Sequence, residues 1–287
     1  MSDENKININ WYPGHMAKTK REINEKLGLI DIVFEVIDAR IPYTSKNKEI
    51  EAMTKNKPRI LVMTKKDLCD LEITNKWVKY YENLGYNVIL VDLIHDKNIN
   101  NILNVTNKLA YEVNEKRRKK GLKPRRVRIL ILGIPNVGKS TLINKLVGKK
   151  ATNVGNKPGI TKSLEWIRIN NDLELLDTPG ILWPKLDGEN TGLNLASMTA
   201  IKEEILNKEI VAIYIINTLK KIYPTRLYER YKIEPKDDIV ETLNDIGKHI
   251  GAIKNGEIDY EKVYTVILKD LREGYFKGVT FDEYQDR

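Results

Sequence analysis

Short apolar runs alternate with helical spacing through the first two thirds of the chain. The apolar runs are nearly continuous, which is typical of strands that are buried on both faces of a sheet. Helical spacing lies between them, for example in Asn75–Leu84 and Asn98–Lys119. Strands separated by helices predict an α/β domain with a mainly parallel sheet and helices on both faces. The predicted strands are Ile32–Ile37, Ile60–Met63, Val88–Val91, Val127–Leu132, Leu164–Ile169 and Leu173–Leu176.

The pattern changes after about residue 190, where helical spacing predominates and no strand pattern is clear. We therefore expect an α/β domain at residues 1–185 and an all-α domain at residues 186–287. The longest apolar run, Ile210–Ile216, is too short to span a bilayer. The helices expected in the second domain are Ala196–Leu206, Ile239–Ile250 and Tyr260–Leu271.

A phosphate-binding loop follows one predicted strand. Gly133–Ser140 has the pattern G-x-x-x-x-G-K-[ST], and a predicted helix, Thr141–Val147, comes directly after it. In such loops backbone amides surround the phosphates, the lysine reaches the β and γ phosphates, and the hydroxyl at the position of Ser140 ligates Mg²⁺. The residues predicted to contact the nucleotide here are Asn136, Val137, Gly138, Lys139, Ser140 and Thr141.

Two further motifs lie downstream at the spacing of a GTPase. Asp177-Thr178-Pro179-Gly180 follows a strand, so that Asp177 can hold Mg²⁺ through water and the Gly180 amide can donate to a γ-phosphate. Lys157–Thr161 lies between the two motifs. A threonine hydroxyl that reaches Mg²⁺ only when the γ-phosphate is present would order this loop, so Thr161 is predicted to act in a nucleotide switch.

A guanine-recognition motif precedes the phosphate loop instead of following it. Thr64-Lys65-Lys66-Asp67 resembles N-K-x-D, in which the carboxylate accepts two hydrogen bonds from guanine and the lysine stem covers the base. Circular permutation explains this order, because the termini of compact domains often lie close together. In a permuted chain the loop after Gly180 leads directly into the helical region. A movement driven by the γ-phosphate would therefore reorient that region.

The whole chain has a net formal charge of +9, and the positive charge is concentrated in its first part. Residues 1–184 contain 33 Lys and Arg against 21 Asp and Glu, whereas residues 185–287 contain 16 against 19. Nine basic residues and no acid occur in 116–128. A basic surface favours RNA, although a solvated linker and a lysine-rich composition explain part of the charge. The predicted RNA contacts are Lys116, Arg117, Arg118, Lys119 and Lys120, with a local cluster of Lys220, Lys221, Arg226 and Arg230 near Tyr223 and Tyr228.

A single cysteine, Cys69, excludes an intramolecular disulfide, and residues 1–10 are polar with no signal-peptide pattern. We therefore expect a cytoplasmic protein. No feature of the sequence demands a dimer, and a monomer is expected.

The motifs together resemble those of the ribosome biogenesis GTPase A (YlqF-type) family. The resemblance rests on the permuted order, Trp11–Lys18, Asp38–Pro42, Gly133–Thr141 and Asp177–Pro184, and it covers essentially the whole chain. It implies a circularly permuted P-loop GTPase domain followed by a helical RNA-binding domain. It also implies GTP and GDP as ligands, Mg²⁺ as cofactor, and a role in late maturation of the large ribosomal subunit, with hydrolysis stimulated by that subunit.

Two departures from the family pattern affect base recognition. Thr64 replaces the usual asparagine, and the second guanine-side loop, where a small residue is usual, reads Asp92–Asp96. Weaker guanine selectivity is expected from both.

Catalysis needs a further group, because Ile181 occupies the position where many GTPases carry a water-orienting glutamine. The resemblance marks the segment of His15 as catalytic, and a neutral imidazole can orient water near pH 7. A structural or RNA-facing histidine is the alternative. Asn136 resembles the residue that helps to bind K⁺ in related GTPases, so K⁺ is a predicted additional cation.

Two other functions are compatible with the sequence. A GTP-gated RNA-binding module with incidental hydrolysis would show very slow turnover even on ribosomes. An ATP-using P-loop enzyme remains open because of Thr64, although Asp67 and the motif at Asp177–Gly180 oppose it.

Overall fold

The computed structural model describes residues 14–96, 99–152, 164–182, 190–201 and 207–285. The first part of the chain forms α1 (Gly14–Lys26), a 3₁₀ turn (Leu27–Leu29), β1 (Ile32–Asp38), α2 (Lys48–Met53), β2 (Arg59–Thr64), α3 (Leu71–Asn83), β3 (Asn87–Leu90), α4 (Asn100–Lys119), β4 (Val127–Leu132), α5 (Lys139–Val147), β5 (Glu165–Arg168) and β6 (Leu173–Asp177). The second part forms α6 (Thr191–Ser197), α7 (Lys208–Ile222), α8 (Pro224–Tyr231), α9 (Ile239–His249), β7 (Ile253–Lys254), β8 (Glu257–Ile258) and α10 (Tyr260–Glu273).

The large sheet has the strand order β3-β2-β1-β4-β6-β5. Every neighbouring pair is parallel except β5 with β6, which is antiparallel. Phe34 of β1 pairs with Ile60 of β2 on one side and with Ile131 of β4 on the other. The predicted α/β class with a mainly parallel sheet is therefore confirmed.

Helices cover both faces of this sheet because successive side chains of a strand point to opposite faces. Phe34 and Val36 lie in one apolar cluster with Ile102 of α4 and Leu142 of α5. The alternate residues of β1 point to the other face and lie in separate clusters. Those alternate residues, Val33 and Ile37, lie in clusters with Ile23 of α1 and Ile50 of α2, and with Trp77 and Tyr81 of α3.

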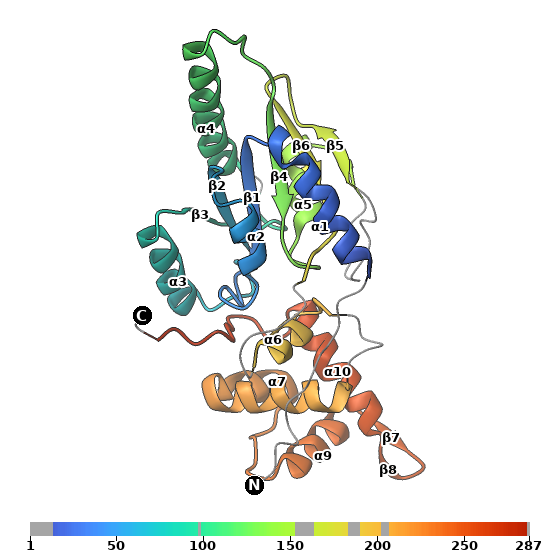
Figure 1. The fold of residues 1–287 in the computed structure, drawn as a ribbon. Coiled ribbons are helices and arrows are strands. Elements are labelled where there is room, and N and C mark those ends of the chain that lie inside the picture. The colour runs from blue at the N-terminus through green and yellow to red at the C-terminus, as the bar shows by residue number, and fades with distance from the viewer. Residues whose placement is uncertain (1–13, 97–98, 153–163, 183–189, 202–206, 286–287) are drawn as a thin grey trace.

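The helical part lies at one end of the sheet, where α6, α7, α9 and α10 are grouped (Figure 1). Ile215 of α7 and Ile267 of α10 belong to the same apolar cluster as Phe34, so one continuous core joins the two parts. In the part of the chain that the structure describes, no helix combines the length and apolarity needed to cross a membrane.

Two expectations for the helical part are wrong. The helix predicted at Ala196–Leu206 does not continue through residues 198–201, because α6 starts earlier and ends at Ser197; residues 202–206 lie outside the described residues. A turn stops α6, because Thr199 adopts a left-handed backbone (φ +58°) and the Ala200 amide bonds to the carbonyl of Leu195. The expectation that this part contains no strand is also wrong. Strands β7 and β8 form a hairpin whose turn, Asn255-Gly256, has positive φ at both residues. An Asn-Gly pair is the sequence signal of such a turn.

The C-terminal segment packs back onto the α/β part. The Phe281 amide donates to the Arg40 carbonyl at 2.7 Å, and the Asp282 carboxylate accepts from the amides of Tyr43 and Thr44, both at 2.7 Å. The indole of Trp77 donates to the Asp282 carbonyl at 3.1 Å. Residues assigned to the second domain by sequence therefore help to close the core under α3, and the boundary at residue 185 stays a prediction.

Candidate functional site

The loops that carry the predicted chemistry lie at the carboxyl ends of parallel strands. Neighbouring parallel strands end at the same edge of the sheet, where α/β proteins bind ligands. The phosphate loop follows β4, the guanine motif follows β2, and the motif that begins with Asp177 follows β6. The fold thus brings together three motifs that are distant in the sequence.

The phosphate loop requires glycine at two positions, one for a close contact and one for its backbone conformation. A Cβ on Gly133 would lie 2.3 Å from the Val36 carbonyl oxygen. Gly138 has φ +93° and directly precedes α5, whose first turn holds Lys139, Ser140 and Thr141. The amides of a helix N-terminus favour anions, so the loop is shaped for phosphate.

Lys139 is buried beneath this loop. Its ammonium donates to the carbonyls of Gly133 at 3.1 Å and Ile134 at 2.9 Å. Burial lowers the pKa of Lys139 to about 8, and the nearby carboxylate of Asp177 opposes that decrease. A buried cation whose hydrogen bonds to the described residues go to backbone carbonyls is well placed to gain from phosphate oxygens.

Asp177 presents a carboxylate that fits a divalent cation. It is 2% exposed, and its Oδ1 has no hydrogen-bond partner among the described residues. Burial raises the pKa of Asp177 to about 6, although Lys139 acts in the opposite direction. Buried polar atoms are normally satisfied, and Mg²⁺ prefers carboxylate and hydroxyl oxygens. Asp177 and the Ser140 hydroxyl are therefore suited to hold Mg²⁺ beside the phosphates.

The segment after Asp177 is hydrogen-bonded to β4 and to the phosphate loop. The Thr178 hydroxyl donates to the Ile131 carbonyl at 2.7 Å, and the Ile181 amide donates to the Gly133 carbonyl at 3.1 Å. A Cβ on Gly180 would lie 2.6 Å from the backbone of Pro135. This close approach puts the Gly180 amide next to the loop where a γ-phosphate would lie.

The first two residues of the guanine motif make contacts with neighbouring elements. Thr64 is buried, and its hydroxyl lies 2.6 Å from the Val137 carbonyl and 3.1 Å from the Ile37 carbonyl. The Thr64 hydroxyl thus connects the end of β2 to the phosphate loop. Lys65 has a left-handed backbone (φ +60°), and its ammonium lies 2.8 Å from Asp38.

The second guanine-side loop is stabilised by its own first residue. Asp92 Oδ1 accepts hydrogen bonds from the amides of Ile94 at 2.8 Å and His95 at 2.9 Å, and Oδ2 lies 2.7 Å from His95 Nδ1. Asp67 lies beside this pair, with ligand atoms of the three residues all within 4.8 Å of one another. Burial and then the charge of Asp92 raise the pKa of Asp67. The side chains of Asp92 and His95 in this loop therefore lie next to Asp67, the predicted guanine-binding carboxylate.

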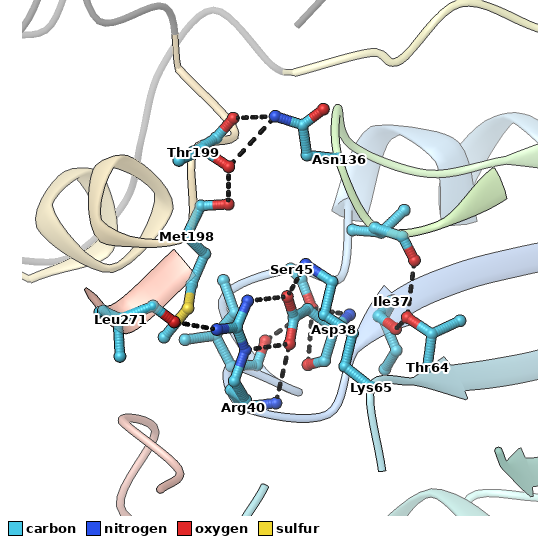
Figure 2. A network of polar contacts seen from close by, with 12 residues as sticks. Ile37, Asp38, Arg40, Ser45, Thr64, Lys65, Asn136, Met198, Thr199 and Leu271 are labelled. Carbon is cyan, nitrogen blue, oxygen red and sulfur yellow. Dashed lines mark hydrogen bonds and ion pairs between the residues drawn. The ribbon is translucent and has the colours of Figure 1, made fainter. Parts of the chain in front are cut away.

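Some predicted site residues are not placed by the structure. His15 lies in the first turn of α1, but its side chain is outside the described residues, and Thr161 lies wholly outside them. Asn136, the predicted K⁺ ligand, has φ +62°, and its amide nitrogen donates to the Thr199 carbonyl at 2.6 Å and hydroxyl at 3.1 Å. The phosphate loop thus contacts the turn after α6 directly (Figure 2).

The predicted RNA contacts fall into two groups. Lys116–Lys119 form the last turn of α4 and Lys120 is its C-cap; in this group Arg117 donates to the Lys123 carbonyl at 3.1 Å and Arg118 pairs with Glu115. In the helical part each candidate has an acidic partner: Lys220 with Asp237, Lys221 with Glu283, Arg226 with Glu229 and Arg230 with Asp270. Of the nearby tyrosines, Tyr223 donates to Asp70 at 3.0 Å, whereas Tyr228 is 54% exposed.

Sequence reasoning gave no chemical role to Asp38 and Arg40, which form a buried ion pair 2.9 Å apart at the end of β1. The available signal was their place directly after a buried strand, at the sheet edge where the nucleotide loops lie.

Comparisons with known proteins agree with this geometry. Residues 32–187 match a family described as RsgA GTPase, and residues 128–252 match one described as 50S ribosome-binding GTPase. A protein of Bacillus licheniformis named Ribosome biogenesis GTPase A is 45% identical over 280 residues, which are 97% of this chain and 99% of that protein. The chain belongs to the ribosome biogenesis GTPase A family.

Solved structures of this family have the same fold. The GDP-bound structure of YlqF is 25% identical with a TM-score of 0.67, and the alignment covers 93% of this chain and all of that one. The GNP-bound YlqF of Thermotoga maritima is 26% identical with a TM-score of 0.65 over 94% of this chain and all of that one. This member of the ribosome biogenesis GTPase A family is therefore a GTPase that binds GTP and GDP and acts in ribosome biogenesis, which excludes the ATP-using enzyme.

Proposed function

We propose that this GTPase acts in late maturation of the large ribosomal subunit, and that the subunit stimulates its GTP hydrolysis. The observation that carries the proposal is the environment of Ile181. This side chain is 4% exposed and lies in an apolar cluster with Ile23 and Leu176, so it cannot orient water at the γ-phosphate. The description of the matching family, 50S ribosome-binding GTPase, supports the large subunit as the partner.

In the proposed reaction Asp67 and Lys65 bind the guanine base. Lys139 and the backbone amides of 136–141 hold the phosphates. Mg²⁺ at Ser140, Thr161 and Asp177 supplies positive charge at the transferred phosphoryl group when it is bound. His15 orients the attacking water, and docking on the subunit brings its segment into place. Asn136 contributes to a K⁺ site that would supply the charge of an arginine finger.

The proposed RNA interface is the C-terminal end of α4. Four basic residues form its last turn, and acids are absent from the following segment to residue 128. Neutralising several phosphates makes affinity strongly dependent on salt. The four candidates in the helical part have acidic partners, and their contact with RNA stays a prediction, as do the cytoplasmic location and the monomeric state.

The test is GTP hydrolysis in K⁺ buffer, with and without purified large ribosomal subunits, and with small subunits as the control. Strong stimulation by large subunits alone is expected, since restoring transition-state stabilisation in such switches is worth about 10³–10⁵ in rate. The variant His15→Ala should keep GTP binding and lose the stimulation.

Three outcomes would contradict parts of the proposal. Equal turnover with and without large subunits would favour a GTP-gated RNA-binding module in which hydrolysis is incidental. Full stimulation of His15→Ala would assign the water-orienting role to another group. Equal rates in Na⁺ and K⁺ would remove the K⁺ site.

A further inference from the structure

A buried ion pair lies next to the guanine motif without belonging to it. Asp38 ends β1, and Arg40 follows two residues later; both side chains are 2% exposed. The guanidinium binds the carboxylate in a bidentate manner, with Nε 3.1 Å from Oδ1 and Nη2 2.9 Å from Oδ2. The Arg40 amide adds a third hydrogen bond to Oδ1 at 3.0 Å. The orientation of the carboxylate is thus fixed from one side (Figure 2).

The other side of the same carboxylate holds the lysine of the guanine motif. Lys65 Nζ donates to Asp38 Oδ2 at 2.8 Å. Burial acts to raise the pKa of Asp38, but the charges of Arg40 and Lys65 hold it well below its ordinary value. The carboxylate therefore stays ionised, and it determines where the lysine stem lies along the base site.

Arg40 also contacts the helical part of the chain. Its Nη1 donates to the carbonyl of Leu271 in α10 at 3.1 Å, and its own carbonyl accepts from the Phe281 amide at 2.7 Å. The residue before Leu271, Asp270, is held by Arg230 at 2.7 Å, so this end of α10 is fixed in turn. A single side chain thus joins the end of α10 to the base side of the nucleotide site (Figure 2).

We propose that Arg40 is a positioning residue for guanine nucleotide binding. It holds Asp38, and Asp38 in turn holds Lys65 at the base. The hydrogen bond from Arg40 to the Leu271 carbonyl makes this arrangement depend on the docked end of α10. The inference rests on the proposed assignment of Lys65 to the base. Coupling between two sites is reciprocal, so bound nucleotide and docked α10 stabilise each other. The helical part then responds to the nucleotide through the residues at the base as well as through the loop after Gly180.

The first experiment measures the dissociation constant of GDP for Arg40→Gln by calorimetry. Affinity is expected to fall about tenfold, which corresponds to about 1.4 kcal/mol. The matched control is Arg59→Gln. Arg59 pairs with the buried Glu35 at 2.9 Å, but at the opposite end of the strand that carries the guanine motif. The control should lose stability and keep the affinity of the parent protein; equal weakening of both variants would reduce Arg40 to a general structural role.

A double-mutant cycle then separates this inference from the assignment of Lys65. In the Lys65→Met background, Arg40→Gln should weaken GDP binding no further, because Arg40 acts through that lysine. Additive losses would overturn the proposed route. Unchanged GDP affinity of Lys65→Met alone would refute the base-site assignment, whereas a loss in Lys65→Met with none in Arg40→Gln would refute only the positioning role.

Hydrogen exchange tests the link to α10. In the parent protein GDP should slow amide exchange in residues 270–276, and in Arg40→Gln this protection should disappear. The same protection in both proteins would overturn the link. If Arg40→Gln does not fold, Arg40→Lys serves in its place, since it keeps the charge but cannot bind Asp38 and Leu271 together.

Discussion

The substitution Asp177→Asn should stabilise the protein in the absence of metal and nucleotide while it abolishes hydrolysis. The folded protein raises the pKa of this carboxyl from 3.8 to about 6, because burial disfavours the charged form. Between these two values the folded protein binds more protons than the unfolded chain, so the free energy of unfolding falls as the pH rises through this window. Above about pH 6 the loss is complete and constant.

The magnitude follows from the difference between the two pKa values. A difference of about 2 corresponds to a cost of about 3 kcal/mol at neutral pH. This is an upper bound for the gain in Asp177→Asn, because the buried Lys139 loses its neighbouring negative charge in the variant. The variant and the parent should unfold alike near pH 4 and diverge by pH 7.

Urea unfolding in EDTA, at a series of pH values from 4 to 8, measures this difference. Adding Mg²⁺ and GTP should then reverse the order, since a ligand at about 1,000 times its dissociation constant stabilises the parent by about 4.1 kcal/mol, which exceeds the gain of the variant. Identical pH dependence of the two proteins would refute the reasoning. It would mean that the unpartnered carboxylate oxygen costs nothing in the empty site.

Three other substitutions test separate contacts. Gly180→Ala should destabilise the protein by about 1–3 kcal/mol and reduce GTP turnover, because the added Cβ would meet the backbone of Pro135. Thermal unfolding and turnover assays measure both effects, and a fully active variant would contradict the contact. Arg230→Gln should cost about 3 kcal/mol in urea unfolding, because the buried Asp270 loses its cation and keeps the hydrogen bond from the Tyr231 hydroxyl. Unchanged stability would show that this ion pair contributes little. Asn136→Gly suits the left-handed backbone and removes the amide that binds the turn after α6, so it should cost about 1 kcal/mol in thermal unfolding. Unchanged stability would show that this contact is unimportant.

The α/β part was largely predictable because its patterns are local. Val127–Leu132 was predicted to the residue as β4, and Leu173–Leu176 missed β6 by one residue. The phosphate loop combines a strand, two glycines and a helix within a short segment, and each piece constrains the next. The place of a motif at a strand end then fixes its place in the fold, since parallel strands share one edge.

The contacts between distant segments could not be predicted in this way. The contact of the Thr64 hydroxyl with the Val137 carbonyl of the phosphate loop was not foreseen, because it depends on how the end of β2 is buried beside that loop. The role of Arg40 depends on Leu271, which lies 231 residues away in the chain. The end of α6 was missed because all of its last residues are buried, so apolar spacing continued past the point where Thr199 turns the chain.

The pairing of β1 with β4 has a consequence for how the protein is made. Ile32 pairs with Ile129, so the middle of the sheet joins segments almost a hundred residues apart. Chains emerge from the ribosome N-terminus first, and contacts between distant residues form slowly. Until β4 is synthesised, β1 has one unpaired edge, and such edges promote aggregation. In the permuted order the guanine-side half is made first, so the nucleotide site cannot close until β4 and the phosphate loop have followed it, and the nascent guanine-side half keeps that unpaired edge until then.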